Sequence, residues 1–208
     1  MTTSGKIELM APAGNFESMQ AALDNGCDSI YFGVEQLNMR ARATVNFVLD
    51  DLPEIARRCK EKNVRTYLTL NTIIYDHDLS IVKTLLTKAK EAGITAVIAS
   101  DQAVIMTART IGIEVHISTQ LNVTNIETVK FYAMFADTIV LSRELSLRQV
   151  KKITDDIEKE QIKGPSGHLV EIEIFGHGAL CMAVSGKCYL SLHSHNSSAN
   201  RGACKQNC

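Results

Sequence analysis

The sequence predicts an α/β fold of the TIM-barrel-like (β/α) type, on the basis of three observations. Short apolar, β-branched runs alternate with amphipathic stretches along the 208 residues. Most of these runs are apolar at every position, which is typical of parallel strands covered on both faces. Polar residues follow nearly every run, and in a barrel such positions converge on one rim. The alternative is an open doubly wound sheet, which would gather its ligand groups at one switch point instead.

Seven segments meet the strand pattern and six segments between them meet the helix pattern. The predicted strands are Ile7–Ala11, Ser29–Val34, Arg65–Leu70, Ala96–Ala99, Glu114–Ser118, Thr138–Leu141 and Glu171–Phe175. The predicted helices are Asn15–Asp24, Leu52–Lys62, Leu79–Ala92, Asp101–Thr110, Ile126–Phe135 and Ser146–Lys159. Asn15 is a plausible N-cap, Pro53 suits a first turn, and Gly93 and Gly112 suit helix ends. This alternation predicts parallel strands joined by right-handed crossovers.

The number of strands suggests an incomplete barrel. A (β/α)8 barrel takes about 250 residues, so we expect a chain truncated before its eighth strand and continuing in a longer protein. We expect residues 1–176 to form the barrel-like domain. Residues 177–208 are then a cysteine-rich segment at the barrel mouth.

Composition excludes some classes of protein. The chain has 22 basic and 23 acidic residues, so it is not basic overall, although a local cationic patch stays open. Aromatic residues are scarce, which argues against a base-stacking surface. No apolar run reaches the ~18–20 residues of a membrane helix, and the polar N-terminus does not resemble a signal peptide. We therefore expect a cytoplasmic protein with no membrane partner, and the sequence predicts no oligomeric state.

Four cysteines are concentrated near the end of the chain. Cys181, Cys188, Cys204 and Cys208 have the spacing C-x6-C-x15-C-x3-C. Thiolates bind iron–sulfur clusters and zinc. Zinc sites usually contain close cysteine pairs, and only the last two resemble one. The wide spacing therefore favours a cluster, with zinc, unligated cysteines or disulfides as alternatives. Cys27 and Cys59 are isolated, and we interpret them as small buried hydrophobic residues.

The segment around the first two of these cysteines carries a family resemblance. Residues 173–191 match every fixed position of E-x-F-x2-G-[SA]-[LIVM]-C-x4-G-x-C-x-[LIVM]-S, the signature of peptidase family U32, the collagenase-like proteases. Asn200–Cys204 resembles the N-[RQ]-G-x-C segment of the same family. Further similarity covers most of the chain, for example at Glu8–Asn15, Asp28–Gly33, Ser118–Asn122 and Leu141–Ser146.

The resemblance implies a barrel-like catalytic region in a longer bacterial or archaeal protein. The family is named for protease activity, yet members act in oxygen-independent hydroxylation. They make 5-hydroxyuridine in tRNA or 5-hydroxycytidine in 23S ribosomal RNA, with prephenate implicated as a hydroxyl source and a [4Fe-4S] cluster as cofactor. Cys181, Cys188 and Cys204 match the first three cluster ligands. The fourth usually lies further downstream, so Cys208 is a ligand or only a neighbour.

Four further residues are candidate catalytic groups. Glu173 and His177 flank the seventh strand, where either could act as an acid or base. His177 could equally be a turn histidine bonded to backbone. Arg143 and Glu144 follow the sixth strand and could anchor an anionic substrate, or Glu144 could simply neutralise Arg143.

Polar residues on the predicted rim are candidates for substrate binding. Arg40 and Arg42 follow the second strand, and their guanidinium groups suit a carboxylate or phosphate. Other rim residues could orient a substrate: Asn46, Asn71, Asp101 and Gln120. Three other histidines have simpler interpretations, since His116 lies mid-strand as an interior residue and His193 and His195 lie in a polar loop.

Two enzyme classes and one non-catalytic role follow from these residues. A protease needs an activated nucleophile or a metal-bound water, and neither G-x-S-x-G nor H-E-x-x-H occurs. His177 could activate Cys181, but a thiol among three others suits metal ligation better. Together with the hydroxylation that the family resemblance implies, this leads us to expect iron–sulfur-dependent hydroxylation of an RNA base, although the sixth helix shows no basic stripe for RNA. The alternatives are a protease and a non-catalytic member of a maturation complex.

Overall fold

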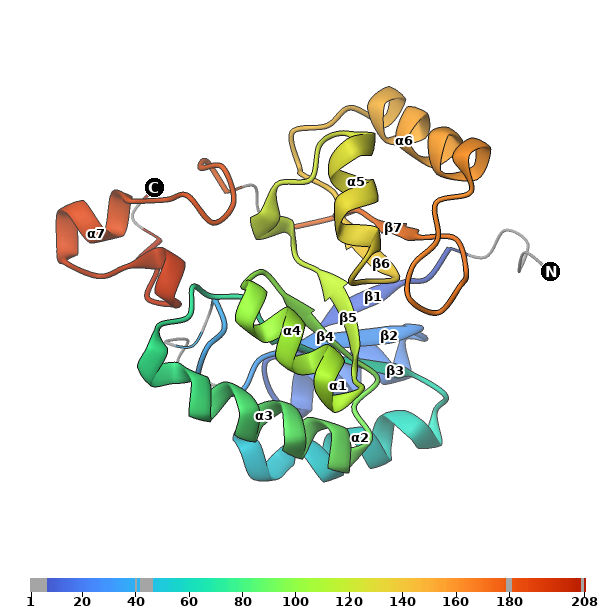
Figure 1. Cartoon of the computed structure of the whole chain (residues 1–208). Coiled ribbons are helices and arrows are strands. Elements are labelled where there is room, and N and C mark those ends of the chain that lie inside the picture. Colours follow the sequence, from blue (N-terminus) through green and yellow to red (C-terminus); the bar gives the residue numbers. More distant parts are fainter. Residues whose placement is uncertain (1–6, 40, 42–46, 179–180, 207) are drawn as a thin grey trace.

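The computed structural model describes residues 7–39, 41, 47–178, 181–206 and 208. Within them, seven strands form one parallel sheet in the order β1-β2-β3-β4-β5-β6-β7. The strands are β1 (Met10–Pro12), β2 (Ser29–Phe32), β3 (Arg65–Leu70), β4 (Ala96–Ala99), β5 (Glu114–Ile117), β6 (Thr138–Val140) and β7 (Glu171–Glu173). Each strand pairs with the next strand along the chain, and the sheet curves into a half-barrel (Figure 1). The predicted fold class is therefore confirmed.

In the part of the chain that the structure describes, six α-helices connect the strands, and a seventh lies near the end of the chain. They are α1 (Phe16–Asp24), α2 (Leu52–Glu61), α3 (Leu79–Ala92), α4 (Gln102–Ile111), α5 (Ile126–Ala133), α6 (Leu147–Glu160) and α7 (Leu190–His195). Asn15 caps α1 by accepting a 2.8 Å hydrogen bond from the backbone N–H of Ser18. Gly93 and Gly112 end α3 and α4 in the left-handed conformation, as the sequence predicts.

The outer face of the sheet holds the main core. Alternate strand residues such as Ile30, Leu68 and Ile117 are fully buried between the sheet and the helices. Phe32 and Phe47 pack edge to face, with ring centroids 5.6 Å apart. This apolar contact fixes the helices against the strands and so positions the loops at the ends of the strands.

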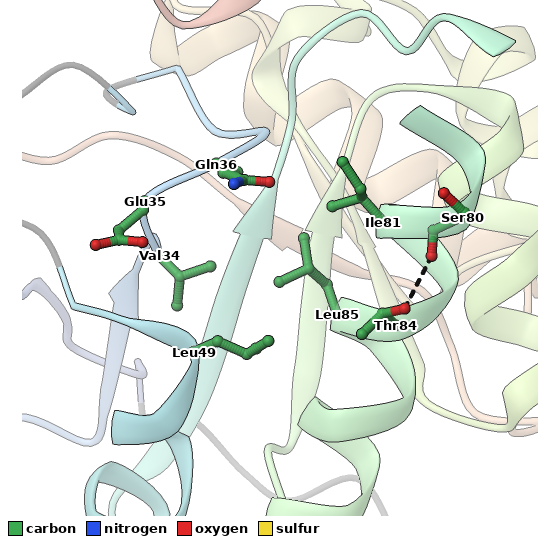
Figure 2. A pocket seen from close by; sticks show the side chains of 8 residues that line it. All are labelled: Val34, Glu35, Gln36, Leu49, Ser80, Ile81, Thr84 and Leu85. Atoms are coloured by element: carbon green, nitrogen blue, oxygen red, sulfur yellow. Dashed lines mark hydrogen bonds between the residues drawn. The ribbon is translucent and has the colours of Figure 1, made fainter. Parts of the chain in front are cut away.

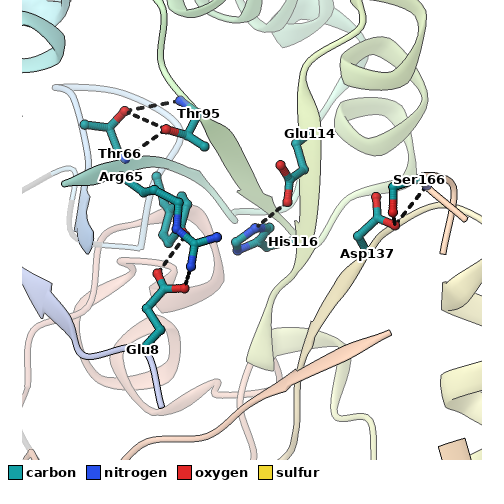
Figure 3. Close-up of polar contacts among 9 residues, drawn as sticks. Glu8, Arg65, Thr66, Thr95, Glu114, His116, Asp137 and Ser166 are labelled. Atoms are coloured by element: carbon teal, nitrogen blue, oxygen red, sulfur yellow. Dashed lines mark hydrogen bonds and ion pairs between the residues drawn. The ribbon is translucent and has the colours of Figure 1, made fainter. Parts of the chain in front are cut away.

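The inner face of the half-barrel is unexpectedly polar. Its apolar part is a small cluster around Tyr67, Ala96 and Ile98. Next to this cluster, Arg65 pairs with Glu8, which also accepts a 2.7 Å hydrogen bond from the Tyr67 hydroxyl (Figure 3). The continuous apolar pattern of the sequence therefore does not extend to every inward-facing position.

The structure corrects three local expectations. The first strand begins at Met10 rather than Ile7, and the seventh ends at Glu173 rather than Phe175. His193 and His195 lie on α7 and not in a loop. This helix is short, has few apolar residues, and is closed by Asn196 in the left-handed conformation, so it lacks a clear periodic signal.

Candidate functional site at the carboxyl ends of the strands

The first half of the cysteine-rich segment contacts the loops after β5 and β6. Asn122 donates a 2.7 Å hydrogen bond to the carbonyl of Ser185. Arg143 donates to the carbonyl of Ala183 at 3.1 Å and to the Ser185 hydroxyl at 2.8 Å. These bonds hold the chain between the first two cysteines across the rim of the half-barrel.

The second half contacts the loop between β3 and α3. The backbone N–H of Ile73 donates to the carbonyl of Asn200 at 3.1 Å. Arg201 donates to the carbonyl of Ile73 at 2.7 Å, forms an ion pair with Asp78, and lies 4.2 Å from the Tyr75 ring centroid. Hydrogen bonding from Arg201 lowers the pKa of the buried Asp78 carboxyl, so the pair is charged at neutral pH.

Two glycines permit these close approaches. Gly186 has a φ of +71°, and a Cβ there would lie 2.9 Å from the carbonyl oxygen of Gln120. Gly202 has a φ of +81°, and a Cβ there would overlap the carbonyl oxygen of Asn38. Both positions need the left-handed conformation and the missing side chain.

A cavity of about 310 Å³ lies between the rim and this segment. Three predicted substrate-binding residues, Asn71, Asp101 and Gln120, line it. On the side of the cysteine-rich segment its lining includes Gly186 and Asn200. The structure thus brings half of the predicted substrate-binding set to one cavity, next to the cysteine-rich segment.

The three predicted residues in this cavity already have protein partners, whereas the buried Thr72 hydroxyl, also in its lining, has none among the described residues. The Asn71 carbonyl oxygen accepts from the backbone N–H of Met39 at 3.0 Å, and its amide donates to Gln120 at 3.4 Å. Asp101 accepts from the backbone N–H groups of Ala103 and Ile74, at 2.8 and 3.0 Å. Asp101 is therefore the N-cap of α4 and a support for the β3 loop, while the Asn71 and Gln120 amides can exchange partners with a ligand.

The remaining rim candidates lie in different surroundings. Arg40, Arg42 and Asn46 lie outside the described residues. Arg143 and Glu144 form no ion pair with each other in the described part of the chain, because Arg143 reaches the cysteine-rich segment. The Ser142 hydroxyl donates to Glu144 and lowers the pKa of its carboxyl. Arg143 is thus a positioning residue here.

Glu173 and His116 face the polar interior below the rim, whereas His177 is exposed. One carboxylate oxygen of Glu173 and the Nδ1 of His116 are buried without a hydrogen-bond partner in the described residues. The Nε2 of His116 lies 3.2 Å from Glu114 (Figure 3). Burial raises the pKa of Glu173, and His116 opposes this effect. His116 is interior, as predicted, but only one of its nitrogens has a partner.

The raised pKa of Glu173 predicts a pH-dependent effect of Glu173→Gln. A carboxyl whose pKa is raised by folding stabilises the folded state below its ordinary pKa, and this stability falls as pH rises. Glutamine does not ionise. We expect the variant to be at least as stable as wild type at neutral pH and to lose this advantage near about pH 4.5. Urea denaturation at both pH values measures this, with the exposed Glu171→Gln on the same strand as control.

The four late cysteines are free thiols. Cys181, Cys204 and Cys208 are exposed, and Cys188 is half-buried, with its backbone N–H donating to Asn200 at 3.3 Å. Soft thiol donors fit an iron–sulfur cluster or zinc in kind. In the described ranges, however, no three His, Cys, Asp or Glu side chains are placed to hold one metal ion. The thiols are therefore the right kind of ligand for such a group, but the described side chains are not gathered around one point.

A second cavity, of about 320 Å³, lies on the outer side of the half-barrel (Figure 2). It is formed by the chain after β2 and by α3, with Val34, Leu49 and Leu85 among its lining residues. None of the predicted site residues lines it, so it is separate from the cavity at the rim. Among the described helices, none has the length and hydropathy of a membrane span.

The comparison with known families decides the identity of the chain. The sequence profile of peptidase family U32 matches residues 14–208. The chain belongs to peptidase family U32. This U32 chain is 57% identical to a collagenase of Porphyromonas gingivalis, over 97% of this chain and 49% of that protein.

Other relatives of the U32 chain carry different names. It is 32% identical to tRNA hydroxylation protein P1 of Bacillus subtilis, over 98% of this chain and 46% of that protein. It is 34% identical to the 23S rRNA 5-hydroxycytidine C2501 synthase of Escherichia coli, over 99% of this chain and 30% of that protein. The U32 chain therefore spans about half the length, or less, of these relatives.

Solved structures share the fold of the U32 chain. The U32 peptidase Mk0906 superposes with a TM-score of 0.58 at 14% identity, covering 84% of this chain and 70% of that one. The tryptophan synthase α subunit of Legionella pneumophila superposes with a TM-score of 0.52 at 18% identity, covering 82% and 73%. Both support the barrel-like architecture alone.

The sequence analysis missed most of the residues that attach the cysteine-rich segment to the rim. Asn200 and Arg201 belong to the matched N-[RQ]-G-x-C segment, which could have drawn attention to them. Asn122 likewise ends the family-like segment Ser118–Asn122, but Asp78 carries no such signal, because a single polar residue in a loop does not indicate its partner. Their roles depend on loops that come together only in the folded chain.

Proposed function

We propose that the protein takes part in iron–sulfur-dependent hydroxylation of a pyrimidine base in tRNA or 23S ribosomal RNA. The observation that carries this proposal is the alignment of almost the whole chain with relatives named for these reactions. The cavity of about 310 Å³ beside the cysteine-rich segment supports it. We further propose that the protein acts in the cytoplasm, where its thiols stay reduced.

In this proposal the late cysteines hold the cofactor. Cys181, Cys188 and Cys204 would bind a [4Fe-4S] cluster, with Cys208 or a residue outside this chain as the fourth ligand. The cluster supplies electron-transfer chemistry when bound. Zinc is the alternative metal, since the last two cysteines have the spacing of a zinc pair.

The other residues of the site would bind the substrate and move protons. The amides of Asn71 and Gln120 can hydrogen-bond to the edge of a base in the rim cavity. Glu173, whose pKa is raised by burial, can hold or release a proton. A small anionic hydroxyl donor such as prephenate would need a guanidinium group, for which Arg40 and Arg42 are the candidates.

Deletion of the gene tests the function. We expect RNA from the deletion strain to lack a 5-hydroxypyrimidine nucleoside by mass spectrometry, and the wild-type gene to restore it. Cys181→Ser should fail to restore it, while Cys27→Ala, a small change at a buried thiol outside the segment, should succeed. Unchanged 5-hydroxypyrimidine content in the deletion strain would reject RNA hydroxylation.

The cofactor has its own prediction. Anaerobically purified protein should be brown and contain iron and acid-labile sulfide, and Cys188→Ser should lower both to a small fraction of the wild-type content. Stoichiometric zinc in a colourless protein would reject the cluster. The Cys59→Ala variant is the control, because that thiol is buried in the core and far from the segment in sequence.

A protease is the second candidate, and the 57% identity to a protein named collagenase favours it. Gelatin cleavage that survives both Cys181→Ser and chelation would establish proteolysis with a different nucleophile. A third role is that of a non-catalytic member of a maturation complex. In that case the purified protein should show neither hydroxylation nor proteolysis, and a partner enzyme should co-purify with it.

A further inference from the structure

Charge is distributed very unevenly along the chain. All 23 acidic residues precede Ile174, so residues 174–208 contain no Asp or Glu. The same stretch contains Lys187, Arg201 and Lys205, and three of the six histidines. A chain with a formal charge of −1 therefore ends in a segment that is purely cationic.

The cationic side chains around α7 are exposed. Arg201 is paired with Asp78, but none of the ion pairs among the described residues involves Lys187 or Lys205. Both lysines are exposed, as are His193 and His195 on α7. By contrast, two exposed lysines of α6 are paired: Lys151 with Asp155 at 2.7 Å and Lys152 with Asp156 at 2.8 Å.

An aromatic ring accompanies these cations. Tyr189 immediately precedes α7 and is 67% exposed. A tyrosine with this exposure contributes little to the core and offers a flat face to solvent, as stacking platforms for unpaired bases do. Lysines beside such a ring are the usual neighbours of a nucleic-acid backbone.

The backbone beneath these side chains is held in place. The backbone N–H of Lys205 donates to the Ser191 hydroxyl at 3.0 Å, which places it beside α7. The backbone N–H of Lys187 donates to the carbonyl of Val184 at 3.2 Å. Cys188, between Lys187 and Tyr189, bonds to Asn200, which lines the rim cavity. The surface therefore adjoins the cavity, and α7 projects from the strands beside it (Figure 1).

We propose that a surface around α7 binds single-stranded RNA. This α7 surface consists of Lys187, Tyr189, His193, His195 and Lys205. The lysines contact phosphates and Tyr189 stacks on an unpaired base, so that a neighbouring nucleotide reaches the rim cavity. The inference rests on the proposed function for its partner, and it adds the surface that holds the RNA.

The test measures binding of a fluorescently labelled single-stranded RNA oligonucleotide to the full chain by anisotropy. We expect Lys187→Glu/Lys205→Glu to weaken binding at least ~10-fold. The plot of log K against log salt should become less steep by ~1.4, the value for two phosphate contacts on a single strand. Tyr189→Ala should weaken binding ~10-fold. The control, Lys151→Glu/Lys152→Glu, changes the net charge equally and should bind like wild type.

Equal RNA affinity of the wild type and the Lys187→Glu/Lys205→Glu variant would overturn the proposal that the α7 surface binds RNA. A loss of affinity in the α6 control as large as in that variant would also overturn it. The side chains substituted in Lys187→Glu/Lys205→Glu and Tyr189→Ala are exposed, so thermal unfolding of these variants should match wild type and loss of fold is checked directly. The α6 control replaces two i,i+4 ion pairs by like charges, so its thermal unfolding temperature should fall slightly. This failure is distinct from failure of the proposed function. The latter is an unchanged 5-hydroxypyrimidine content in the deletion strain, which does not depend on these lysines.

Discussion

Gly202→Ala is expected to destabilise the packing of the cysteine-rich segment on the half-barrel by about 3 kcal/mol or more. A side chain at a φ of +81° costs ~1–2 kcal/mol. The new Cβ would also overlap the carbonyl oxygen of Asn38, which is backbone and cannot rotate away. We expect this variant to show faster proteolysis after β7 and to lose any activity that depends on Cys204.

Gly112→Ala is a matched control for this substitution. Gly112 has a φ of +80°, but a Cβ there meets nothing within 4 Å. Its cost should therefore be limited to the backbone strain of ~1–2 kcal/mol. Chemical denaturation and limited proteolysis compare the two variants. Equal costs for both would show that the contact between Gly202 and Asn38 does not constrain the segment.

Asp78→Ala is expected to have the second largest effect, about 2–4 kcal/mol, because it leaves the guanidinium of Arg201 without its partner. The Asp78 side chain is 6% exposed and that of Arg201 23%. Asp78 also accepts a 2.9 Å hydrogen bond from the backbone N–H of Tyr75, so the loop after β3 loses a support as well.

A double-mutant cycle isolates the ion pair. Arg201→Met should also be destabilising, because it leaves the buried Asp78 carboxylate without its cation, although methionine can still pack on Tyr75. The double variant should cost clearly less than the sum of the two single ones, by about 1 kcal/mol or more. Strict additivity in urea denaturation would contradict a direct coupling between Asp78 and Arg201.

The same pair gives the stability a defined pH dependence. The pKa of Asp78 is lowered in the folded protein, so its contribution is complete above the ordinary carboxyl pKa and disappears as pH falls through the lowered value. Wild type and Asp78→Ala should therefore approach each other in stability under acidic conditions. A difference that stays constant down to that range would contradict this assignment.

The fold was predictable because its signals are local. Short apolar runs and helix-ending glycines such as Gly93 occur within a few residues of the elements they define. The polar inner face was not predictable, because inward and outward positions of a strand differ only once the sheet has curved. Arg65 at the start of β3 meets Glu8 in the chain before β1, and neither carries a sign of this in its own segment.

The site was predictable only in part. Asn71, Asp101 and Gln120 follow parallel strands, whose carboxyl ends share one rim, so the sequence could place them together. Asp101 begins a predicted helix, so its role as a cap was available from the sequence, whereas its second bond to the Ile74 N–H was not. The partners of Arg143 and Arg201 were missed, because each contact joins segments about 40 residues or more apart.

The cysteine-rich segment is anchored twice, once by Arg143 beside β6 and once by Arg201 beside β3. Cys188 lies near the first anchor in the chain and Cys204 near the second. The curvature of the sheet between those strands thus governs how far apart the two anchors stand, and the hydrogen bond from the Cys188 N–H to Asn200 joins one anchor to the other. Evolution could retune this spacing by altering barrel residues remote from any cysteine.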